Sequence, residues 1–126
     1  MAATLRAGLS LGLCGFTFWS HDIGGFTQRS PEDLYLRWLA FGMLTSHSRC
    51  HGQPPKEPWE YGEEFTDMFR KIVEFKYSLL PYILEQSLES LEKGFPLLRT
   101  LFFEYPDDKT AWYIDDEYFF GDKISR

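Results

Sequence analysis

The sequence has few cysteines, no run of basic residues and no long apolar segment, and each shortage excludes a class of protein. Two cysteines among 126 residues, Cys14 and Cys50, are too few and too far apart to form a disulfide framework. A formal net charge of −6 argues against a nucleic-acid partner. The apolar stretch of residues 7–16 falls well short of the roughly 20 residues that a membrane-spanning helix needs, so we expect no membrane partner.

The same N-terminal stretch has the length of a secretory signal core and follows a basic residue, Arg6. Three glycines interrupt it, at Gly8, Gly12 and Gly15, and no small-x-small cleavage site follows. We therefore expect no secretory signal, which favours an intracellular protein.

Aromatic residues make up 18% of the chain, and the most informative segment is residues 15–26, GFTFWSHDIGGF. The aromatic and β-branched residues at 16–19 alternate with the two-residue period of a strand. His21 and Asp22 follow, and Gly24-Gly25 permit a sharp turn with positive φ. This layout is typical of the active-site rim of an α/β barrel. A buried strand that ends in an ordinary polar turn explains the pattern about equally well.

The rest of the chain predicts an α/β fold. Apolar periodicity predicts helices over residues 4–13, 31–43, 62–80 and 82–93, and it predicts strands over 16–19, 43–46 and 97–103, with a weaker strand over 113–120. Ser30 suits the cap of the second helix and Pro31 its first position. This order supplies about two βα units, whereas a closed (β/α)8 barrel takes about 250 residues. The chain is therefore either a small α/β layer or a piece of a larger barrel.

Several motifs in sequence order closely resemble glycoside hydrolase family 31, and the α-xylosidase branch in particular. They are LRAGLSLGLCGF and WSHDIGGF near the N-terminus, RW and FG in the next helix, SHSRCHG and EPW after it, and LLPY, EYPDD and FGD toward the C-terminus. Together they cover nearly the whole chain.

The resemblance implies a retaining α-glycosidase built on a (β/α)8 TIM barrel with flanking β-rich domains. Residues 1–95 would form the C-terminal part of that barrel, about strands 7 and 8 with their helices, and residues 96–126 would begin the following β domain. The family's nucleophile, and its acid/base in a Trp-x-Gly-Asp segment, would both lie upstream of Met1. An α-linked oligosaccharide or glycoside is the implied substrate, and no cofactor is expected.

The resemblance also implies roles for individual side chains. Four would contact or line the sugar subsite: His51, Asp22, Trp19 and Phe18. Arg49 would pair with carboxylates and His21 would orient the Asp22 loop, whereas His47 is expected to be structural. For Trp19, core packing and sugar contact are equally favoured.

Two other functions compete with this one. His47 and His51 are four residues apart with Cys50 between them, which could indicate zinc, but Gly52 and Pro54 argue against the helix that such spacing needs. The chain could also be a non-catalytic remnant that binds carbohydrate weakly. The sequence leaves xylose or glucose specificity and the oligomeric state open.

Overall fold

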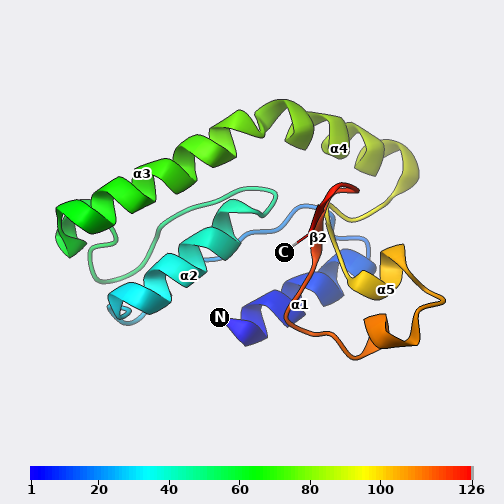
Figure 1. The fold of residues 1–126 in the computed structure, drawn as a ribbon, viewed down its shortest axis with the longest axis horizontal. Helices are drawn as coiled ribbons and strands as arrows, with labels where there is room; N and C mark the ends of the chain where they lie inside the picture. Colours follow the sequence, from blue (N-terminus) through cyan, green and yellow to red (C-terminus); the bar gives the residue numbers. More distant parts are fainter. Residues whose placement is uncertain (126) are drawn as a thin grey trace. The chain divides into compact units, whose positions relative to one another are not determined.

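The computed structural model describes residues 1–125, which form two compact units (Figure 1). The first unit joins residues 1–19 to the residues from Pro81 onward, and the second unit is Ser20–Leu80. Within residues 1–125, every helix is too short or too polar to span a bilayer.

The first unit combines helices with a small sheet. Its helices are α1 (Ala2–Leu13), α4 (Leu80–Lys93), α5 (Leu101–Glu104) and a 3-10 helix at Lys109–Trp112. The first residue of α4, Leu80, belongs to the second unit. Its antiparallel sheet has the order β1 (Leu98–Arg99), β2 (Phe119–Phe120), β3 (Ile124–Ser125). Leu98 pairs with Phe120, and both side chains are fully buried, so this pair lies at the centre of the unit's core.

Two glycines let other groups pack closely against α1. A Cβ atom built on Gly8 would lie 2.0 Å from the Trp19 ring, and one on Gly12 would lie 3.1 Å from Pro96 Cβ. Glycine at these positions therefore allows the indole and the proline ring to lie directly on the helix backbone.

A buried arginine ties together three segments of the first unit. The Arg99 guanidinium is 3% exposed and forms ion pairs with Glu104 at 2.7 Å and Glu89 at 3.0 Å. It also donates to Gln86 Oε1 and to the Pro96 carbonyl. Its charge is thus balanced by two carboxylates from α4 and α5.

The second unit contains α2 (Glu32–Met43), a 3-10 helix at Pro58–Tyr61, and α3 (Glu63–Ser78). Its buried core is an apolar cluster that draws residues from α2, α3 and the loop before α2: Ile23, Tyr35, Leu39, Met43 and Phe65. The two long helices contact each other, and the loops that precede and follow α2 pack onto this core.

The predicted helices are confirmed, because strong apolar periodicity and end signals set them locally. The break between the third and fourth helices falls at Leu79, two residues before Pro81, and α4 ends before Gly94, whose φ is +72°. The capping prediction at Ser30 is wrong. The Ser30 hydroxyl donates to the Gly24 carbonyl at 2.6 Å, and Pro31 takes the cap position.

The predicted strands are wrong or too long. Residues 16–19 and 43–46 are not strands, and β1 and β2 occupy only two residues each of the predicted 97–103 and 113–120. A strand needs a partner as well as an alternating sequence. Around the first two segments, the β-pairing found among residues 1–125 is one parallel bridge, between Asp22 and Arg49.

Candidate functional site

The site is built on a tight turn in the second unit. Gly24 and Gly25 have φ values of +83° and +76°, as their sequence predicted, and the Gly25 amide donates to the Asp22 carbonyl at 2.9 Å. Ile23 is fully buried, and a Cβ on Gly42 of α2 would lie 2.4 Å from its side chain. The turn is therefore fixed by Ile23 packing on α2, with Asp22 held at its start.

A second loop, residues 49–57, runs beside this turn and is hydrogen-bonded to it. The Ile23 amide donates to the Arg49 carbonyl at 3.1 Å, and the Gln53 amide donates to the Phe26 carbonyl at 2.8 Å. Gly52 lies between these bonds, where a Cβ atom would come within 2.9 Å of two carbonyl oxygens of the turn. The absence of a side chain at Gly52 allows this close approach. Residues 22–28 (the Asp22 loop) and residues 49–57 (the His51 loop) are thus joined by hydrogen bonds, and we call them the fastened pair of loops.

Asp22 and Arg49 form an ion pair across the two loops. Arg49 Nη2 lies 2.7 Å from Asp22 Oδ1, and the carboxylate is more sheltered than the guanidinium, with side-chain exposures of 20% and 60%. A partly exposed pair of this kind contributes at most about 1 kcal/mol to stability. Its main effect is to orient the carboxylate, while Oδ2 keeps its capacity to accept a hydrogen bond.

His21 lies against the aromatic side chains of α2. Its ring stacks on Phe41 with centroids 4.5 Å apart and on Trp38 at 6.2 Å. Burial lowers the pKa of His21 to about 4, although the neighbouring Asp22 charge opposes the shift. The imidazole is consequently neutral at pH 7 and packs as an aromatic ring directly before Asp22.

His51 is exposed on the second loop. Its ring is tilted against Phe26, with centroids 5.6 Å apart. It borders a hollow of about 290 Å³ that is lined by residues 50–57. The imidazole is thus held beside an open cavity, where a ligand hydroxyl could reach it.

Lys56 also belongs to this site, although no pattern in the sequence predicted it. It is only 4% exposed, and its ammonium donates to the carbonyls of Gly24 at 3.0 Å and Gln28 at 2.7 Å. Its own carbonyl accepts a 2.7 Å hydrogen bond from the hydroxyl of the buried Tyr35. Burial lowers the pKa of Lys56. The prolines around it predict only a loop, and no pattern marks a buried cation there.

The two predicted aromatic site residues belong to the first unit. Phe18 is 46% exposed, whereas Trp19 is 9% exposed with its ring packed against Gly8. This contact describes the packing of Trp19, and a sugar contact of either ring stays a prediction.

His47 lies beside a different cavity of the second unit, of about 440 Å³. Its Nδ1 is 3.1 Å from the Ser46 hydroxyl. Lys76 of α3 lines the same cavity and donates to Ser48 Oγ at 2.7 Å and to the Thr45 carbonyl at 3.0 Å, and burial lowers its pKa to about 8. Lys76 thereby fastens the segment that carries His47 to α3.

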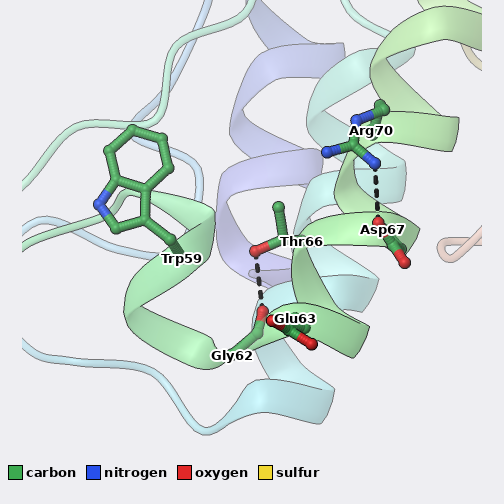
Figure 2. Close-up of a pocket in the computed structure, with 6 residues that line it drawn as sticks. All are labelled: Trp59, Gly62, Glu63, Thr66, Asp67 and Arg70. Atoms are coloured by element: carbon green, nitrogen blue, oxygen red, sulfur yellow. Dashed lines mark hydrogen bonds and ion pairs between the residues drawn. The ribbon is translucent and has the colours of Figure 1, made fainter.

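A third hollow of the second unit, of about 400 Å³, lies at the start of α3 (Figure 2). The exposed Trp59 indole stands on one side of it, and Asp67 and Arg70, which form a 2.7 Å ion pair, stand on the other. This hollow shares no lining residue with the one beside His51.

The geometry does not assemble the zinc ligands that the spacing of His47, Cys50 and His51 could have indicated. Residues 46–52 are not helical, so the two histidines do not share a helix face. Among residues 1–125, no three histidine, cysteine or acidic side chains are grouped so that they could hold a metal ion.

Two family models match the chain in succession. The model of the glycosyl hydrolases family 31 TIM-barrel domain matches residues 1–86, and that of the glycosyl hydrolase family 31 C-terminal domain matches residues 94–124. An α-xylosidase of Emericella nidulans is 47% identical over 125 residues, which cover 98% of this chain and 16% of that protein. The α-xylosidase XylQ of Lactiplantibacillus pentosus is 45% identical, over 95% of this chain and 16% of that protein.

Solved structures agree with this match. A family 31 α-xylosidase from a soil metagenome, complexed with xylose, has a TM-score of 0.86 and 32% identity over 93% of this chain and 21% of that one. A Flavobacterium johnsoniae family 31 dextranase, complexed with glucose, has a TM-score of 0.90 and 35% identity over 98% of this chain and 16% of that one. The chain spans about a sixth of the length of the curated relatives named above.

Proposed function

The chain belongs to glycoside hydrolase family 31, and on that premise we propose that it supplies part of the sugar subsite of a retaining α-glycosidase. The substrate class is a terminal α-xyloside or α-glucoside. Residues 1–95 would be the C-terminal part of the catalytic barrel and residues 96–126 the start of the next domain. The relatives' names support this class, since α-xylosidases and an α-glucosidase are among them.

The fastened pair of loops is the observation that carries the proposal. It holds a carboxylate, Asp22, and an imidazole, His51, on two loops joined by backbone hydrogen bonds. Carboxylate oxygens accept hydrogen bonds from sugar hydroxyls, and an imidazole can donate or accept one. Two such groups on a rigid frame can fix the orientation of a sugar ring.

In retaining hydrolysis, these loops would bind the substrate, and the two reacting carboxyl groups would come from elsewhere. That reaction needs two carboxyl groups about 5 Å apart, one attacking the anomeric carbon and one protonating the leaving oxygen. We assign both to segments outside this chain. Asp22, paired with Arg49, would bind a hydroxyl rather than attack the sugar. A hydrogen bond from His51 would accelerate the reaction to the extent that it tightens as the ring approaches its oxocarbenium-like transition state.

A segment replacement tests the proposal. The 125-residue segment of the Emericella nidulans α-xylosidase that matches this chain is replaced by this chain, and hydrolysis of an aryl α-xyloside is measured. We expect turnover by the chimera and none above background by the isolated 126-residue chain. A chimera that unfolds cooperatively like its host but shows no turnover would contradict the proposal. So would turnover by the isolated chain that Asp22→Asn abolishes.

A further inference from the structure

Lys56 is a buried cation whose charge is satisfied by backbone carbonyls. Its ammonium is within 3.0 Å of two carbonyl oxygens, those of Gly24 and Gln28, and none of the ion pairs among residues 1–125 includes it. An ammonium that leaves water for such a position is stable only if it keeps these bonds, because an unpaired buried charge is costly. These two hydrogen bonds therefore restrict the positions of the two carbonyls as well as the position of the lysine side chain.

The position of the two acceptors decides what this constraint does. Gly24 and Gln28 lie on either side of Phe26, the residue whose ring contacts His51 and whose carbonyl accepts from Gln53. The backbone of Lys56 is in turn fixed to the core by the Tyr35 hydroxyl. One residue thus joins the Asp22 loop through its side chain, and the helix core through its backbone, to the His51 loop.

We propose that Lys56 is the positioning residue of the sugar subsite, which it forms by clamping the turn after Asp22 onto the loop that carries His51. This rests on the function proposed above. Because Lys56 binds backbone carbonyls, it does not compete with Arg49 for the Asp22 carboxylate. Lys56 joins the loops and leaves the Asp22 carboxylate to Arg49 and to substrate.

The first test measures the clamp in the 126-residue chain by amide hydrogen exchange. Lys56→Met removes the ammonium and keeps most of the side-chain volume. We expect the Ile23 and Gln53 amides, which bond the two loops together, to exchange at least about 10-fold faster, because hydrogen bonds from a charged donor are stronger than those between neutral groups. The amide of Leu39, inside α2, should keep its protection. Lys56→Arg, which retains the charge and the donors, should protect the loop amides better than Lys56→Met does.

Lys71→Met is the matched control, because Lys71 is an exposed lysine of α3 in the same unit. It should leave all three amides unchanged. Unchanged Ile23 and Gln53 exchange in Lys56→Met would overturn the clamp. Equal acceleration of Leu39 would also overturn it, because Lys56 would then act on the stability of the whole unit.

The second test separates the clamp from the sugar subsite. In the chimera, Lys56→Met should lower kcat by up to about 10²-fold at an unchanged Tm, because small displacements of binding groups have effects of that size. A variant that keeps the chimera's full kcat would overturn the positioning role. A chimera that is inactive even with Lys56, together with altered loop exchange, would instead refute the proposed function and leave the clamp standing.

Discussion

Among residues 1–125, each unit contains one cation that is less than 5% exposed, and the two are satisfied in different ways. In the first unit, Arg99 pairs with the carboxylates of Glu89 and Glu104. In the second unit, Lys56 donates to two backbone carbonyls. The comparison separates two uses of a buried charge. A carboxylate-paired arginine holds helices together, whereas a lysine on carbonyls fixes the conformation of loops that carry candidate binding groups.

The largest effect on stability should come from the first unit. Arg99→Met leaves Glu104 without its cation and leaves Glu89 with Lys93 alone, and breaking a buried ion pair by removing one partner costs about 3–5 kcal/mol. Denaturant unfolding should show a loss near this range. Arg70→Met, which removes an exposed pair with Asp67, should cost well under 1 kcal/mol. Equal effects of the two variants would show that the Arg99 cluster is not a structural centre.

A pair of glycine variants tests whether the two units respond separately. Gly8→Ala forces a methyl group into the Trp19 ring of the first unit, and Gly52→Ala forces one against the carbonyls of the turn in the second. Overpacking of this kind costs about 1–3 kcal/mol each. Hydrogen exchange should rise around α1 in the first variant and at Ile23 and Gln53 in the second. The opposite distribution would contradict the packing described here.

A smaller effect concerns the pH dependence of stability in the second unit. Burial lowers the pKa of His21 to about 4 from an ordinary value of 6.5, so between these values the unfolded chain binds more protons than the folded one. The contribution of His21 is fully present above pH 6.5 and is lost as the pH falls toward 4, with a slope of at most about 1.4 kcal/mol per pH unit. His21→Phe, which keeps a ring on Phe41, should flatten this part of the curve. An unchanged slope in urea unfolding would show that His21 is not the titrating group.

The sequence predicted the helices well and the strands poorly, for a physical reason. Helix periodicity and a terminal glycine such as Gly94 act within a few residues, so they can be read locally. A strand depends on a partner elsewhere, and the alternation at residues 16–19 does not supply one. The Gly24-Gly25 turn was predicted correctly because positive φ is a local property of glycine.

The family resemblance selected residues for the candidate site, and their place in a sugar subsite stays a prediction, whereas the contacts that support them were not predicted. The family resemblance selected Asp22, Arg49 and His51, and the structure places all three on the fastened pair of loops. Lys56 was not predicted, because a lysine among prolines is typical of an exposed loop. Its burial results from two carbonyls that lie about 30 residues away in sequence, which no local pattern reveals.

The most direct test of the central claim is the effect of His51→Ala on kcat/KM of the chimera with an aryl α-xyloside, measured beside His47→Ala. Removing a hydrogen bond that tightens in the transition state typically costs about 2–4 kcal/mol, or on the order of 10²-fold in rate. We expect a loss of this size for His51→Ala at an unchanged Tm, and only a change in Tm for His47→Ala. A His51→Ala chimera with the parent's kcat/KM would remove His51 from the sugar subsite and contradict the account.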